Sequence, residues 1–175
     1  FWRADAVEVL RASPDRVTPP CPVAGPGGCG GCDFQHASVP AQRALKAAVV
    51  AEQLARLARL DVAVEVEPVP GDEAGLRWRS RVRYARTPDG SRGMRRFRSH
   101  DVIPVEDCLI AARDAGEPTD EVVEHRVVAA GAEHAFSVAG DGFWQVHPGA
   151  PTVLVEAVLG IADPRPGERV LDLYA

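Results

Sequence analysis

The stretch Cys21-Pro-Val-Ala-Gly-Pro-Gly-Gly-Cys29-Gly-Gly-Cys32 decides how the first half of this 175-residue chain is expected to fold. Proline and glycine dominate it, so neither a regular helix nor a strand is expected there. Such backbone can instead wrap around a small object, because glycine lets the chain approach a ligand closely. We therefore expect the surrounding fold to be organised by whatever its cysteines hold.

A fourth cysteine, Cys108, follows Cys32 after 75 intervening residues. Three clustered thiolates and one distant partner suit a [4Fe–4S] cluster, and the same set could hold a structural zinc ion. Two disulfides are possible on number alone, but a cytoplasmic protein disfavours them. The spacing by itself favours the iron–sulfur cluster over zinc by a narrow margin.

The segment between Arg77 and Arg98 is strongly cationic. It holds nine arginines and a single acid, Asp89, whereas the whole chain has a formal charge of −5. Because the chain has one lysine and nineteen arginines, arginine is its default surface cation, yet that bias does not explain the missing acids. The asymmetry favours a face that binds a polyanion, with RNA as the expected polyanion, over a merely solvated face.

Periodicity predicts an α+β arrangement around these features. A helix should begin at the cap Ser38 and end near Asp61, and an edge strand should cover 62–69. The arginine-rich segment reads as a hairpin, with 79–86 and 94–97 joined by a Pro88-Asp89-Gly90 turn. Further elements are expected, namely strands over 4–10, 134–138, 143–146 and 169–173 and helices over 118–130 and 151–159.

Taken in order, several motifs carry a family likeness. They are Ser13-Pro-Asp-Arg16, Cys29-Gly-Gly-Cys-Asp-Phe-Gln-His36, Trp78-Arg-Ser-Arg-Val-Arg83, Phe97-Arg-Ser-His100, Val105-Glu-Asp-Cys108, Gly142-Phe-Trp-Gln-Val-His147 and Val170-Leu-Asp-Leu-Tyr174. Together they resemble the bacterial RNA (uracil-5-)-methyltransferases, and in particular the iron–sulfur 23S ribosomal RNA branch with a TRAM domain. The likeness extends over nearly the whole chain.

The resemblance implies three parts. Residues 1–12 would be the last strand of a TRAM β-barrel, 13–138 a central α+β domain with the iron–sulfur site, and 139–175 the start of a Rossmann-like α/β methyltransferase domain. The chain would then be a truncated piece of a longer protein. His147 and Ser80 stand where the family more often has asparagine.

The resemblance also assigns roles to single residues. Cys21, Cys29, Cys32 and Cys108 would hold the [4Fe–4S] cluster. Gln145 would contact the methionine part of S-adenosyl-L-methionine, and Tyr174 would be the aromatic residue before the cofactor loop. The arginines expected to contact RNA are Arg79, Arg81, Arg83, Arg95, Arg96 and Arg98.

The family's chemistry sets a limit on what this chain is expected to do. A cysteine thiolate adds to uracil carbon 6, and carbon 5 then takes the methyl group. A carboxylate base removes the carbon 5 proton, and the cysteine leaves carbon 6 as the double bond re-forms. All four cysteines are expected as metal ligands, so we identify no catalytic residue and expect the chain alone to be inactive.

We expect a cytoplasmic monomer without a membrane span, which binds ribosomal RNA in preference to transfer RNA. A zinc-stabilised RNA-binding module without catalysis is the alternative that the arginines and cysteines alone would support.

Overall fold

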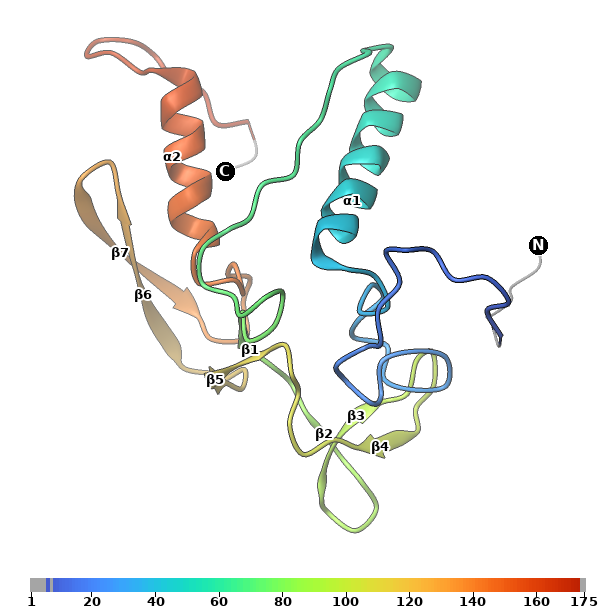
Figure 1. The fold of residues 1–175 in the computed structure, drawn as a ribbon. Coiled ribbons are helices and arrows are strands. Elements are labelled where there is room, and N and C mark those ends of the chain that lie inside the picture. The colour runs from blue at the N-terminus through green and yellow to red at the C-terminus, as the bar shows by residue number, and fades with distance from the viewer. Residues whose placement is uncertain (1–5, 7, 174–175) are drawn as a thin grey trace. The chain divides into compact units, whose positions relative to one another are not determined.

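The computed structural model describes residue 6 and residues 8–173 (Figure 1). The chain divides into two compact units. The first holds the described residues up to Pro68 together with Asp72–Glu117, and the second holds Val69–Gly71 and the described residues from Pro118 onward. None of the described helices is long and apolar enough to cross a bilayer.

The first unit contains one long helix, α1, over Val39–Gln53, which continues as a π-helical turn, η1, over Leu54–Ala58. The Ser38 hydroxyl accepts a hydrogen bond of 3.4 Å from the Ala41 N–H, which confirms the predicted cap. No residue of α1 is buried, and Leu57 is 81% exposed. The apolar stripe of this helix is therefore left uncovered within the described part of the chain.

The arginine-rich hairpin is present, but it is shorter than predicted. Its two strands are β2, Ala85–Arg86, and β3, Arg92–Arg95, and β4, Val102–Pro104, pairs on the far side of β3. The predicted turn is confirmed, since the Thr87 N–H bonds to the Ser91 carbonyl at 3.0 Å and Gly90 has a φ of +86°.

The first part of the predicted strand over 79–86 goes elsewhere. β1, Arg79–Arg81, pairs in parallel with β5, Ala111–Gly116, and the Val82 N–H bonds to the Gly116 carbonyl at 3.0 Å. Val82 is among the most buried residues of the unit, with 3% exposure. Val82 lies between the stretch that pairs with β5 and the stretch that pairs with β3. Its burial gives a physical reason why one alternating run contributes strands to two sheets.

The second unit is built on a hairpin, with α2 against its first strand (Figure 1). The strands are β6, Val122–Ala129, and β7, Ala132–Ala139, and the helix α2 covers Ala150–Ala162. The prediction of a helix over 118–130 was wrong. Its valines favour a strand, and Ala130-Gly131, with φ of +51° and +75°, forms the two-residue turn that twisted hairpins prefer.

Two other predicted elements are confirmed, and several are absent. The strand over 134–138 lies within β7, and the helix over 151–159 lies within α2. The segments 62–69, 143–146 and 169–173 form no strand, because no neighbouring segment pairs with them in the part of the chain that the structure describes. The predicted strand over 4–10 lies partly outside the described residues, and residues 6 and 8–10 form none.

Candidate metal centre and the arginine surface beside it

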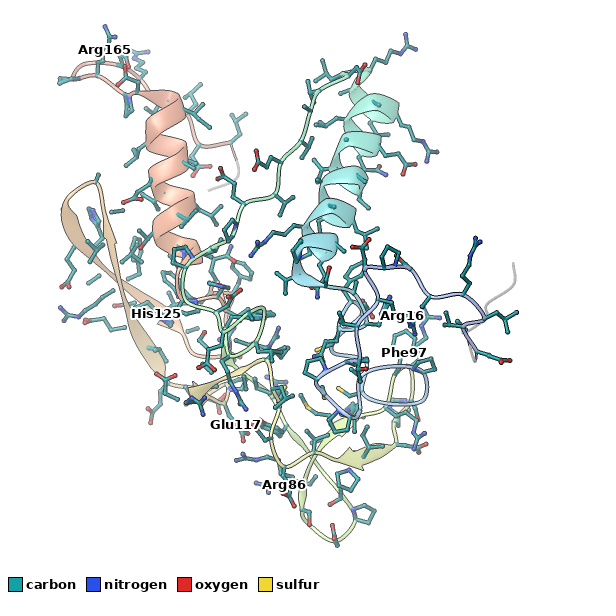
Figure 2. The ribbon with its side chains drawn as sticks, in the orientation of Figure 1. Arg16, Arg86, Phe97, Glu117, His125 and Arg165 are labelled. Carbon is teal, nitrogen blue, oxygen red and sulfur yellow. The ribbon has the colours of Figure 1, made fainter. Side chains whose placement is uncertain are left out.

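The four cysteines line one cavity of the first unit, here called the cysteine cavity, with a volume of about 250 Å³. Cys21, Cys29 and Cys32 come from the glycine-rich loop, and Cys108 comes from the turn that precedes β5. All four are half-buried free thiols, so no disulfide joins them. Figure 2 shows the yellow sulfur atoms gathered between the loop and the strands below it. The structure thus brings together the four residues that the sequence analysis singled out.

Backbone hydrogen bonds give the cysteine loop, residues 21–32, its shape. The Cys29 N–H bonds to the Val23 carbonyl at 2.9 Å, and the Ala24 N–H bonds to the Cys21 carbonyl at 3.1 Å. A Cβ atom on Gly28 would stand 2.1 Å from the Val23 carbonyl oxygen. Only glycine fits there, because any side chain would force apart the bonded segments that place Cys29.

Arg77 holds the turn that carries Cys108. Its guanidinium donates to Asp107 Oδ1 at 2.8 Å and to Asp107 Oδ2 at 2.5 Å, and it reaches the main-chain carbonyls of Cys108 and Ala111 at 3.4 and 3.3 Å. The hydrogen bonds from Arg77 lower the pKa of the Asp107 carboxyl. Arg77 belongs to the cationic segment, but its contacts stabilise the turn that carries Cys108. The sequence analysis had given it no such role.

The electrostatics of Cys32 show how closely the four thiols interact. Burial is the largest cause that raises the pKa of the Cys32 thiol, and negative charge on Cys108, Cys29 or Cys21 would raise it further. A donor interaction from the Gln35 side chain acts in the opposite direction. Four thiolates could share this cavity only if a cation compensated their mutual repulsion.

Gln35 contributes an unusual polar atom beside the thiols. Its side-chain carbonyl accepts a hydrogen bond of 3.1 Å from the Cys21 N–H. Its amide nitrogen Nε2 is buried and has no hydrogen-bond acceptor of the usual geometry among the described residues, although the amide lies near enough to Cys32 to favour the thiolate. A buried donor without an acceptor costs roughly 1–3 kcal/mol. A metal-bound thiolate sulfur would supply that acceptor.

Sequence reasoning quoted Gln35 only as part of a motif. Its position three residues after Cys32 was the signal available.

The described residues do not form a site for a single metal ion. Among the described residues, no group of three or more His, Cys, Asp or Glu side chains lies close enough together to hold one ion. The sulfurs share a cavity without converging on a single point.

The six arginines predicted to contact RNA do not all lie in one place. Arg79 and Arg83 line the cysteine cavity. Arg83 also lines a neighbouring pocket together with Arg95, Arg96 and Arg98. Arg81 lies in β1, outside the linings of both.

The predicted cofactor residues belong to the second unit. Gln145 is half-buried in the loop between β7 and α2. Its neighbour Trp144 stacks on His125 of β6, with ring centroids 4.3 Å apart, and tilts against Phe136 of β7 at 5.6 Å. This stacking anchors the loop to the hairpin. Tyr174 lies outside the described residues, so its predicted role stays a prediction.

Comparisons with known proteins give relatives along almost the whole chain. A protein of Streptomyces avermitilis named as an uncharacterized RNA methyltransferase is 39% identical, and the match covers 99% of this chain and 55% of the relative. A protein of the same description in Bifidobacterium longum is 32% identical, over 93% of this chain and 50% of the relative. No family model matches the chain.

A further relative has a more specific name. The 23S rRNA (uracil(1939)-C(5))-methyltransferase RlmD of Shewanella amazonensis is 36% identical over 120 residues, which is 67% of this chain and 27% of the relative. The chain spans about half the length of three of the curated relatives that it matches. The stretch aligned with the Streptomyces avermitilis protein, 241 residues, is longer than this whole chain, so that relative carries residues within the stretch that this chain lacks.

Proposed function

This chain belongs to the bacterial RNA methyltransferases that include the 23S rRNA uracil-C5 enzymes, and from that premise we propose that it serves methylation of uracil carbon 5 in RNA. The RNA would be 23S ribosomal RNA, and the reaction would take place in the cytoplasm. The proposal rests on one observation. Four cysteines, from two segments 75 residues apart in the sequence, line one cavity of an arginine-rich unit.

In this proposal the cysteine cavity holds a [4Fe–4S] cluster. Four thiols suit the cluster because iron–sulfur sites are built from soft thiolate ligands. The buried Nε2 of Gln35, which lacks an acceptor, supports the same reading, since hydrogen bonds to ligand sulfur are a regular part of such sites. Val82, Met94 and Val105 complete the lining with apolar surface that would keep water from the sulfurs.

The structural consequence of such a cluster would be to tie the cysteine loop to the turn before β5. Metal binding contributes folding free energy when it joins ligands that are distant in the sequence. In this chain the joined parts are the loop 21–32 and the Cys108 turn, and between them lies the cationic segment. The cluster would thereby fix the surface that docks RNA.

S-adenosyl-L-methionine supplies the electrophilic methyl group in this reaction. Gln145, held beside the anchored Trp144, would orient the methionine part of that cofactor. The cationic segment would bind the phosphates of the RNA. With all four cysteines assigned to the cluster, no thiolate of this chain is left to attack carbon 6, so the chain alone should not transfer methyl groups.

Two assays on the same preparation test the proposal. The chain should bind a 23S rRNA transcript with an affinity that falls steeply as salt rises, and it should transfer no label from tritiated S-adenosyl-L-methionine. A chimera that joins this chain to the part of the Streptomyces avermitilis relative left outside the match should release tritium from RNA labelled at uracil carbon 5. Label transfer by the chain alone would refute the assigned role of its cysteines, and a chimera that methylates another atom would refute the uracil-5 assignment.

A further inference from the structure

A second hollow lies against the cysteine loop, with a volume of about 530 Å³, and is here called the arginine pocket. Cavities of roughly 300–1,000 Å³ are the usual size for small-molecule ligands. Its lining includes four guanidinium groups, those of Arg83, Arg95, Arg96 and Arg98, and two aromatic rings, those of Tyr84 and Phe97. None of the residues that line it is acidic.

Three of the four guanidiniums of the pocket contact groups other than carboxylates. Arg96 donates to the Gly27 carbonyl at 2.8 Å, Arg95 lies 3.3 Å from a ring nitrogen of His100, and Arg98 stands 4.7 Å over the Phe97 ring. In the described part of the chain, none of the four forms an ion pair with a carboxylate. Their positive charge is therefore oriented but not neutralised, which suits a ligand with phosphate groups.

Phe97 offers an apolar ring at the same place. It is 44% exposed, and Figure 2 places it beside the loop that carries the cysteines. A Cβ atom on Gly30 would stand 2.7 Å from the Phe97 ring, so the ring packs directly on this glycine. A partly exposed aromatic ring that is held against the backbone, with a guanidinium beside it, is a surface on which a nucleic-acid base can stack.

The arginine pocket shares a wall with the cysteine cavity. Cys29, Gly31, Arg83 and Met94 line both. The two are also joined by backbone, since Cys29 forms an isolated β-bridge with Arg96, and the Phe97 N–H bonds to the Gly28 carbonyl at 2.9 Å. The position of the loop that carries Cys29 therefore sets the positions of Arg96 and Phe97.

We infer that the arginine pocket binds one nucleotide of single-stranded RNA, with its base stacked on Phe97 and its phosphates on the surrounding arginines. The inference rests on the proposed function and names the part of the surface where an unpaired nucleotide is held. Occupation of the cysteine cavity holds the loop in place, so RNA affinity depends on it. A volume of about 530 Å³ has room for one extruded nucleotide.

The test uses fluorescence anisotropy of the 175-residue chain with a labelled single-stranded uridine-rich oligonucleotide at low salt. Phe97→Leu keeps an apolar contact on Gly30 but removes the stacking face. Base stacking on an aromatic ring supports a loss of affinity of roughly 5- to 100-fold. Arg98→Gln should lower affinity for every sequence and reduce the slope of log affinity against log salt by roughly one.

The matched control is Arg113→Gln, which removes an exposed arginine of β5 that pairs with Glu73 and lies outside the arginine pocket. Its affinity should stay within twofold of the unchanged chain. Thermal unfolding of each variant shows whether the fold is kept. If Phe97→Leu unfolds, the chain of unchanged sequence is labelled with fluorinated phenylalanine instead. Stacking is then detected as a change in the fluorine signal when RNA binds.

The outcomes separate the two proposals. No binding of RNA by the unchanged chain at low salt would overturn the proposed function. Salt-dependent binding that Phe97→Leu leaves intact would overturn the pocket alone. Uridine monophosphate that binds as tightly as the oligonucleotide would show a site for free nucleotides and would overturn the RNA assignment.

The dependence on the cysteine cavity has its own measurement. Removal of metal from the unchanged chain by a chelator under reducing conditions should weaken the oligonucleotide affinity at least as much as Phe97→Leu does. Cys108→Ser should act in the same direction, because Cys108 lines the cysteine cavity but not the arginine pocket. An affinity that neither treatment changes would overturn this dependence.

Discussion

Arg77→Gln tests whether one arginine of the cationic segment holds the fold rather than the RNA. The Arg77 side chain is only 17% exposed, and its guanidinium spans the Asp107 carboxylate and the carbonyls of Cys108 and Ala111. Glutamine removes the positive charge and is too short to reach all three. We expect the turn before β5 to loosen, and with it the position of Cys108.

The expected size follows from the contacts. Because the Asp107 side chain is 58% exposed, the ion pair contributes about 0.5–1 kcal/mol. The two bonds to main-chain carbonyls are long, at 3.4 and 3.3 Å, and contribute about 0.5 kcal/mol each. The variant should therefore lose about 1.5–2 kcal/mol of unfolding free energy. For a chain of this size that loss lowers the melting temperature by roughly 3–8 °C.

Arg86→Gln is the matched control, because Arg86 is an exposed arginine of β2 with a single long bond of 3.3 Å, to the Gly90 carbonyl. Its unfolding free energy should change by less than about 0.5 kcal/mol. Thermal unfolding followed by far-ultraviolet circular dichroism measures both variants. Equal melting temperatures for Arg77→Gln and Arg86→Gln would refute the reasoning that Arg77 clamps the Cys108 turn.

Three other predictions concern the loop, the orphaned amide and the hairpin turn. Gly28→Ala should lower metal content and thermal stability, because its Cβ would meet the Val23 carbonyl oxygen. Gly116→Ala should change neither quantity, because its Cβ would have no atom within 4 Å. A Gly28→Ala variant that is stable and binds metal fully would argue against the loop geometry. Gln35→Leu should lower the reduction potential of the iron–sulfur cluster, measured by voltammetry. The variant lacks the amide donor that stabilises the reduced, more negative form of the cluster. An unchanged potential would show that the Gln35 amide does not face a ligand sulfur. Hydrogen bonds from the Thr87 hydroxyl, and then from the Ser91 N–H, lower the pKa of Asp89. The contribution of Asp89 to stability is therefore present above its unfolded pKa and is lost as pH falls through its folded pKa. Thr87→Val should raise the pKa of Asp89 in a carboxyl NMR titration, and an unchanged pKa would refute this cause.

Local signals in the sequence predicted the parts of the fold that local chemistry controls. Ser38 caps α1 because its hydroxyl reaches an N–H three residues ahead, and the Pro88-Asp89-Gly90 turn forms because aspartate and glycine satisfy its backbone demands. The meeting of the four cysteines was also predicted, from thiol chemistry and from the family resemblance. The cap and the turn need no knowledge of distant pairing.

The errors come from pairing between distant segments. Nothing in the run around Arg79 indicates that it will pair in parallel with β5, since the alternation of a strand names no partner. The segment over 118–130 was predicted as a helix, but it contributes β6, which pairs with β7, and its valines and the glycine at 131 favour this hairpin. The role of Arg77 was missed for the same reason, because its partners lie about thirty positions along the chain.

The arginine surface could be predicted as a charge but not as a pocket. Composition showed nine arginines and one acid between Arg77 and Arg98, and so indicated a polyanion. Only the folded chain shows that Arg83, Arg95, Arg96 and Arg98 surround one hollow while Arg77 faces a carboxylate. The shared wall with the cysteine cavity depends on the bridge between Cys29 and Arg96, which no spacing in the sequence reports.

The iron, zinc and acid-labile sulfide content of the chain, expressed and purified without oxygen, shows directly whether the cysteine cavity holds a cluster, together with the visible absorption spectrum. We predict about four iron and four sulfide per chain and a broad brown absorption, as for a [4Fe–4S] cluster on four thiolates. About one zinc per chain without sulfide would contradict the cluster and favour the zinc-stabilised RNA-binding module.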